Sequence, residues 1–141
     1  MYESYSKQAL PEKNYRELLG TAMCVFNSNN SFVIENILNN DDKDNYNWHN
    51  LIDRTSGKLV TAIKETITKK SNTEIADLFV SLVDKRNRII HSFQITDKTG
   101  VQVLSTKEKN GEQYIITEKF LLEFIKGNDE LSGLLHKFRG H

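Results

Sequence analysis

Arginine, asparagine and histidine occur together in the segment from Arg86 to His91, which reads Arg-Asn-Arg-Ile-Ile-His. Arginine stays charged and donates two parallel hydrogen bonds to phosphate oxygens, and histidine gives or takes a proton near neutral pH. These groups suit cleavage of RNA, because the strand supplies its own nucleophile, the 2′-hydroxyl. His91 would activate that hydroxyl or protonate the leaving oxygen, Arg86 would stabilise the charged transition state, and no metal ion or other cofactor is needed.

The helix expected to carry this segment has an apolar stripe that is interrupted at Arg86. Successive residues of an α-helix are rotated by about 100°, which places Arg86 near the centre of the apolar face. A guanidinium there has a desolvation penalty of several kcal/mol unless an anion compensates it. Arg86 therefore either pairs with a buried carboxylate, such as that of Glu35 or Asp53, or lines a cleft. The stripe consists of Ile75, Phe79, Leu82, Ile89 and Phe93.

Asn87 and His91 lie four residues apart and share a second face of the same helix. The step of five residues from Arg86 to His91 separates these two side chains by about 140° on a straight helix. They can act together only where the helix bends near its end or where a second copy of the chain completes the site.

Further charged residues flank the segment. Arg88 and Lys85 are candidates for contacts with an RNA backbone, although an ion pair between Asp84 and Arg88, one turn apart, is the simpler explanation of Arg88. Three more lysines either form a second basic cluster or decorate a solvated helix: Lys64, Lys69 and Lys70.

The spacing Arg86-Asn87-x-x-x-His91 resembles the R-x(4–6)-H motif of HEPN domains, in which a polar residue, often asparagine, follows the arginine. The resemblance implies a helical bundle with the motif toward the end of a long helix, and it covers nearly the whole chain. It also implies a metal-independent endoribonuclease that acts as a homodimer, with the two motifs facing each other across a cleft.

The same resemblance suggests a toxin or phage-defence context and an antitoxin or effector as a further partner. Phe93 departs from one branch of the family, which carries tyrosine two residues after the histidine, so control through modification of that tyrosine is not expected. The alternative is a non-catalytic HEPN-like module that dimerises or binds a nucleotide or partner protein.

Composition predicts one folded domain over residues 1–141. Nineteen basic residues balance nineteen acidic ones, so any attraction to RNA must come from a local patch. Cys24, the only cysteine, lies in an apolar run typical of a core residue in a reducing compartment. The polar start lacks the order of a signal peptide, and no apolar stretch is long enough to span a membrane. A cytoplasmic protein without membrane contact is therefore expected.

Hydrophobic periodicity predicts an all-α fold, an antiparallel bundle of four to five helices with a small β-hairpin at about residues 100–117, before the last helix. Ser71 and Glu74 match a capping box at the start of the helix that carries Arg86. The expected helices are 11–38, continuous or broken near Ser28, then 57–70, 71–93 and 118 onward, with strands at 101–106 and 113–117.

A metal hydrolase is not favoured by the sequence. The histidines show no paired ligand spacing, and the acids of the loop after residue 39 lack the glycine and distal glutamate of a calcium loop. The histidines are His49, His91, His136 and His141, and the loop acids are Asp41, Asp42 and Asp44.

Overall fold

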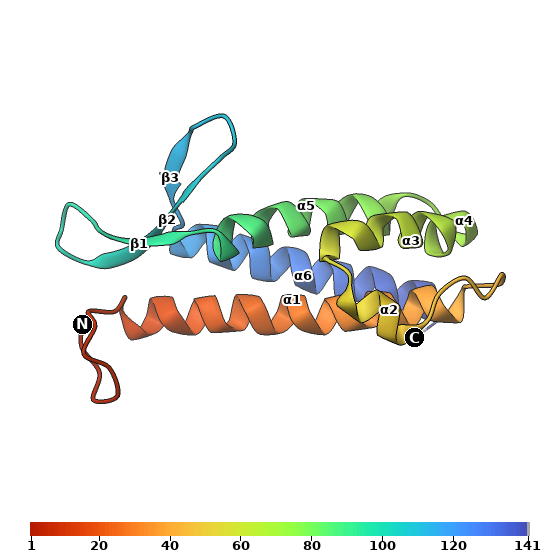
Figure 1. Ribbon diagram of the computed structural model, residues 1–141, viewed down its shortest axis with the longest axis horizontal. Coiled ribbons are helices and arrows are strands. Elements are labelled where there is room, and N and C mark those ends of the chain that lie inside the picture. The colour runs from red at the N-terminus through yellow and green to blue at the C-terminus, as the bar shows by residue number, and fades with distance from the viewer. Residues whose placement is uncertain (141) are drawn as a thin grey trace.

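Three long helices and a small sheet dominate the computed structural model, which describes residues 1–140, so that His141 lies outside the described residues. The sheet lies at one end of the bundle, and the short helices lie toward the other (Figure 1). In chain order the elements are α1 (Lys13–Asn39), α2 (Trp48–Asp53), a 3-10 turn (Ser56–Lys58), α3 (Leu59–Glu65), α4 (Ile67–Lys70), α5 (Glu74–Ile90), β1 (Phe93–Thr96), β2 (Gln102–Lys107), β3 (Gln113–Ile115) and α6 (Glu118–Arg139).

The first helix, α1, is continuous across the polar stretch near Ser28, where the sequence allowed either a continuous or a broken helix. Asn29, in the middle of that stretch, is buried, and its side-chain nitrogen donates to the backbone oxygen of Asn128 at 2.7 Å and to its side-chain oxygen at 3.0 Å. A buried amide is tolerated when its polar atoms are paired in this way. The polar residue therefore joins α1 to α6 and does not interrupt α1.

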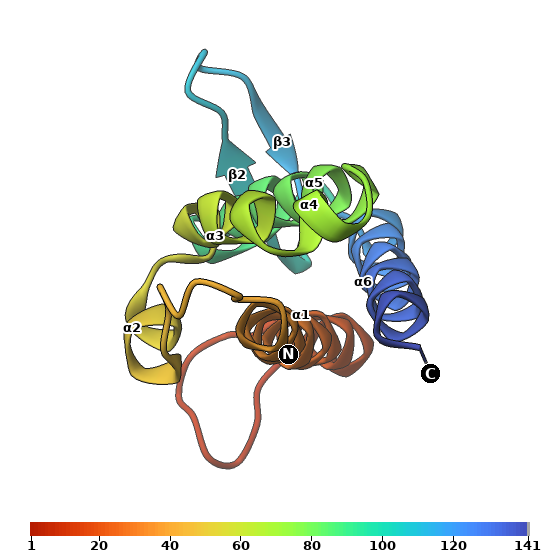
Figure 2. The same ribbon diagram turned by 90° about the vertical axis from the view of Figure 1, so that its right-hand side faces the viewer.

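The bundle is not antiparallel throughout, which corrects the prediction. Contacts between α1 and α6 run in the same order along both helices, from Asn14 with Glu118 to Glu35 with Arg139. These two helices are therefore parallel, and α5 runs in the opposite direction (Figure 1). The reason is that the segment after α1 turns back before α3 begins, so that α3 and α5 lie beside α1 (Figure 2). The helix α6 then follows α5 in the opposite direction, which is the direction of α1.

The start and end of α5 both differ from the prediction. Ser71 does not form the expected capping box, because its hydroxyl donates to the Ile67 oxygen at 2.8 Å, and the Glu74 N–H is accepted instead by the Asn72 side chain at 2.9 Å. The helix ends at Ile90, so Phe93 belongs to β1 and is 43% exposed. The predicted helix over 57–70 is broken at Thr66, which separates α3 from α4.

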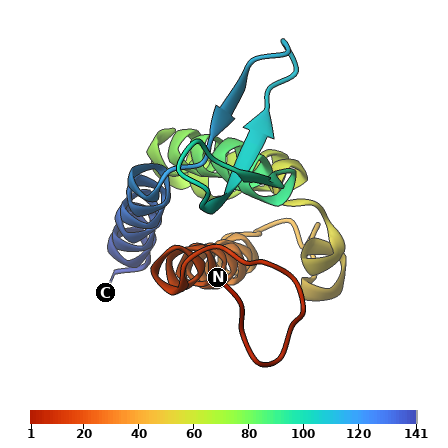
Figure 3. The same ribbon diagram turned by 90° about the vertical axis from the view of Figure 1, so that its left-hand side faces the viewer.

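The sheet has three antiparallel strands in the order β1-β2-β3, where the sequence predicted a two-stranded hairpin. The fold is therefore mainly α, as expected, and the correction is a three-stranded sheet in place of the hairpin. The missed strand is β1, which pairs Phe93 with Ser105 and Thr96 with Gln102. The β2–β3 hairpin projects away from the helices (Figure 3). No helix among residues 1–140 combines the length and the apolar character needed to cross a membrane.

Tyr15 attaches the sheet to α1. Its buried hydroxyl donates to the Ile116 oxygen at 2.6 Å and accepts from the Leu104 N–H at 3.1 Å. We expect Tyr15→Phe to lower the free energy of unfolding by about 1–3 kcal/mol, because both backbone groups lose their partner. Urea unfolding measures the change, with Tyr2→Phe as the control, since Tyr2 is 70% exposed. An equal effect of the two substitutions would contradict this role of Tyr15.

Candidate active site

Arg86 lies on the side of α5 that faces α1, as the interrupted apolar stripe predicts. Its guanidinium carbon is 5.6 Å from the centre of the Phe26 ring, and the side chain is half-buried. Phe26 in turn stacks with Phe79 and Phe124, at centroid distances of 6.2 and 6.0 Å. The cation therefore lies at the border of the aromatic core, where water screens its charge less than at an open surface.

No carboxylate neutralises Arg86 among residues 1–140. Its one polar contact in this range is a long hydrogen bond of 3.4 Å from its Nη1 to Oδ1 of Asn87. Glu35, named above as a partner for it, lies instead 3.4 Å from Arg139, and Asp53 forms no ion pair in the described part of the chain. The reading in which Arg86 belongs to a buried ion pair is therefore wrong, and its guanidinium remains able to bind an anion.

His91 stands at the C-terminal cap of α5, and its side chain is exposed. Its backbone N–H donates to the Asn87 oxygen at 2.9 Å, the ordinary bond of an α-helix, whereas its φ of −93° and ψ of 22° lie outside the helical range. The helix α5 is continuous from Glu74 to Ile90, and the step of five residues places Arg86 and His91 about 140° apart around its axis. Within one chain the two side chains point to different sides of the helix.

Arg88 is held by the β2–β3 hairpin and not by Asp84. Its Nη1 donates to the backbone oxygen of Lys107, and its Nε lies 3.9 Å from Oε2 of Glu108. The other oxygen of Glu108 accepts from the Tyr114 hydroxyl at 2.7 Å. These three side chains, the Arg88–Glu108–Tyr114 network, fix the position of the hairpin against α5.

The pKa of Tyr114 is raised from an ordinary value of 10.0 to about 12. Burial is the largest cause, followed by the hydrogen bond to Glu108 and the negative charge of that residue. A raised tyrosine pKa favours the folded state below pH 10, and this contribution is lost as the pH rises from 10 through about 12. We therefore expect Tyr114→Phe to remove part of the loss of stability in that range. Urea unfolding of both proteins from pH 10 to pH 12 checks this, and an equal loss of stability in the two proteins would contradict it.

A pocket of about 800 Å³ opens between α5 and the hairpin. It brings together three of the five predicted site residues, Lys85, Asn87 and Arg88, whereas Arg86 and His91 do not line it. Its opposite wall contains Tyr114 and Phe120, which the sequence analysis did not single out. No local signal could have found these two aromatic residues, because their role depends on where the hairpin folds.

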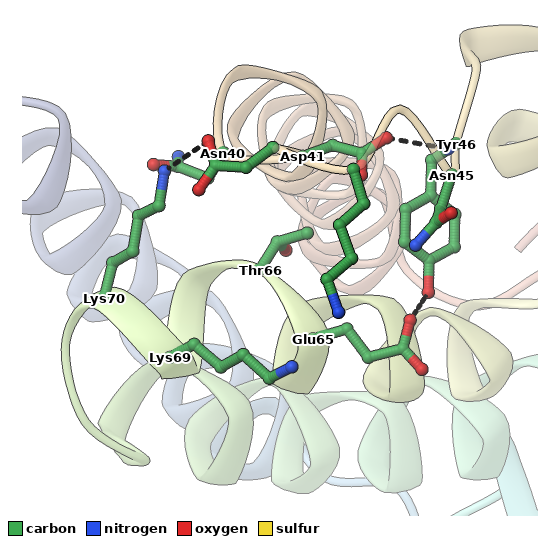
Figure 4. Close-up of a pocket in the computed structure, with 10 residues that line it drawn as sticks. Asn40, Asp41, Asn45, Tyr46, Glu65, Thr66, Lys69 and Lys70 are labelled. Carbon is green, nitrogen blue, oxygen red and sulfur yellow. Dashed lines mark hydrogen bonds and ion pairs between the residues drawn. The ribbon is translucent and has the colours of Figure 1, made fainter.

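A second pocket, of about 270 Å³, lies toward the opposite end of the bundle (Figure 4). It contains two members of the predicted lysine cluster, Lys69 and Lys70, but acidic residues line it as well. Lys70 pairs with Asp42 at 3.0 Å, and Glu65 accepts from the Tyr46 hydroxyl. Lys70 and Glu65 are therefore already engaged by other side chains, and neither has the uncompensated charge that Arg86 has.

The three histidines of residues 1–140 lie on different elements: His49 in α2, His91 after α5 and His136 in α6. No group of three or more histidine, cysteine or acidic side chains is placed to hold a metal ion in this part of the chain. Cys24 is exposed on α1, which corrects its expected place in the core.

Comparisons of the chain with protein-family models, with curated proteins and with solved structures give no match. The resemblance to HEPN domains therefore rests on the spacing of Arg86, Asn87 and His91 and on their position at the end of a long helix. Membership of that family stays a prediction.

Proposed function

We propose that the chain is a cytoplasmic, metal-independent endoribonuclease that acts as a homodimer and leaves 2′,3′-cyclic phosphate ends. The observation that carries the proposal is the half-buried guanidinium of Arg86, which has no carboxylate partner in the described chain. A cation in this setting favours an anionic ligand, since an anion compensates the lost hydration. A phosphodiester has the required charge and geometry.

In the proposed reaction, the 2′-hydroxyl of the RNA attacks the adjacent phosphorus and displaces the 5′-oxygen of the next nucleotide. Arg86 stabilises the negative charge that develops on the phosphate oxygens. His91 takes the proton from the 2′-hydroxyl or gives one to the leaving oxygen. Asn87 contacts Arg86 and orients its guanidinium.

The homodimer supplies what one chain lacks, because Arg86 and His91 diverge on a single copy of α5. Exposed apolar side chains lie beside His91 in the chain and on the sheet that follows it: Ile90 is 46%, Phe93 43% and Ile115 42% exposed. Phe93 and Ile115 are both paired with Ser105 of β2, so they lie on the same face of the sheet.

A non-catalytic module that dimerises or binds a nucleotide or partner is the second candidate. It is favoured by the same divergence of Arg86 and His91 and by the commitment of Arg88 to the hairpin, which leaves fewer free groups for chemistry. A toxin or defence role, with an antitoxin or effector as a partner, belongs to the first candidate.

The experiment that separates the two candidates is incubation of the purified chain with RNA in excess EDTA. Products with 2′,3′-cyclic phosphate ends are the expected result, because the proposed reaction needs only the 2′-hydroxyl and protein side chains. Intact RNA after prolonged incubation of a dimeric preparation would contradict the enzyme and favour the module.

A further inference from the structure

The pocket between α5 and the β2–β3 hairpin, called here the hairpin pocket, has the size of a binding site for a small organic group. Its volume of about 800 Å³ falls within the range of roughly 300–1,000 Å³ that ligand sites occupy. One wall comes from α5 next to Arg86, and the other from the hairpin and the first turn of α6.

Two lysines on opposite walls of the hairpin pocket have side chains that are unpaired within residues 1–140. Lys85 belongs to α5 and Lys109 to the turn of the hairpin, and neither forms a hydrogen bond or ion pair within residues 1–140. Arg88, by contrast, is occupied by Glu108 and the Lys107 oxygen. The lysines are therefore the groups of this pocket that are able to neutralise the phosphates of a nucleic-acid strand.

Aromatic rings line the same pocket. Tyr114 and Phe120 are half-buried, with centroids 6.4 Å apart and planes inclined at 47°. The hydrogen bond from Tyr114 to Glu108, which itself lies beside Arg88, restrains the Tyr114 ring. A restrained aromatic ring in the wall of a pocket suits stacking of a nucleobase, because every base has a π-face.

Two carboxylates of the pocket, those of Asp84 and Glu112, form no ion pair in the described chain. A carboxylate accepts hydrogen bonds from the amino groups on the edge of a base, whereas it repels a phosphate. The mixture of lysines, aromatic rings and carboxylates thus fits a whole nucleotide better than a bare anion.

We infer that the hairpin pocket binds one unpaired nucleotide of a single-stranded RNA, with its base against Tyr114 and its phosphates between Lys85 and Lys109. Asn87 lines this pocket and also contacts Arg86, so a strand held there continues toward the guanidinium. The substrate class of the proposed ribonuclease is therefore unpaired RNA. This inference takes RNA as the ligand from the proposed function but does not require catalysis.

The test measures binding of a labelled, short single strand of 2′-O-methyl adenosine by fluorescence anisotropy, since this strand lacks the nucleophile and stays intact. Tyr114→Leu, which removes the ring, is expected to weaken binding about tenfold or more, the range of one lost stacking contact. Tyr114→Phe keeps the ring and loses only the hydrogen bond to Glu108, so it is expected to bind more tightly than Tyr114→Leu. A strand of abasic residues, with the same backbone charge, is expected to bind as weakly to the wild type as the adenosine strand binds to Tyr114→Leu.

Lysine variants provide a second measurement that leaves the ring in place. Lys109→Ala is expected to weaken binding and to reduce its dependence on salt, whereas Lys98→Ala, in the turn between β1 and β2, changes neither. Equal affinity for adenosine and abasic strands, equal effects of the two tyrosine variants, or no binding at all would overturn the inference. Ring-dependent binding without RNA cleavage would refute the ribonuclease and leave the nucleotide pocket standing.

Discussion

The Arg86→Ala variant is expected to lose RNA cleavage by about a hundredfold to a thousandfold, while its fold and stability are retained. Loss of one donor that stabilises transition-state charge has an effect of this size. Stability is retained because Arg86 has no ion pair to lose within the described residues, and its contacts are the Phe26 ring and a long hydrogen bond to Asn87. His91→Ala is expected to lower the rate by about a hundredfold to ten-thousandfold, the usual contribution of a general acid or base.

Single-turnover cleavage of RNA in excess EDTA measures both effects. His49→Ala is the matched control for His91, because His49 is an exposed histidine on α2. Arg86→Lys keeps the charge but loses the planar pair of donors, so it is expected to fall between alanine and the wild type. Cleavage at the wild-type rate by folded Arg86→Ala would refute the proposed role of this arginine.

Mixing the inactive Arg86→Ala and His91→Ala proteins is expected to restore about a quarter of the wild-type activity. If each site combines Arg86 of one copy with His91 of the other, a mixed dimer has one intact site and one doubly defective site. Random exchange makes about half of the dimers mixed, and each has half of the normal number of sites. If each site lay within one chain, no mixed dimer would contain an intact site.

The contact surface is tested in the same mixing experiment by Phe93→Glu, which places a charge on the exposed face of the sheet beside His91. This variant is expected to sediment as a monomer and to lose both activity and the ability to complement. Val80→Glu is the control, because Val80 is 39% exposed on α5 but lies well before the motif. An inactive mixture of stable dimers would refute the composite site.

Local sequence patterns predicted the helices well and their ends poorly. The helix α1 continues through its polar stretch because the buried side chain of Asn29 is hydrogen-bonded to Asn128, a residue almost a hundred positions away. The end of α5 was misplaced because Phe93 continues the helical period, yet it forms the first residue of β1. A short strand with a helical spacing of apolar residues cannot be recognised until its partner strand is known.

The sequence by itself determined the residue types of the candidate site and their faces on α5, since a helix sets the direction of each side chain from its spacing alone. Tertiary structure decided which of these groups remain free. It placed Arg86 against Phe26 with no carboxylate partner among residues 1–140, and it paired Arg88 with Glu108 of the hairpin. The physical reason is that the partner of a charge depends on which distant segment lies beside it, and no local period contains that information.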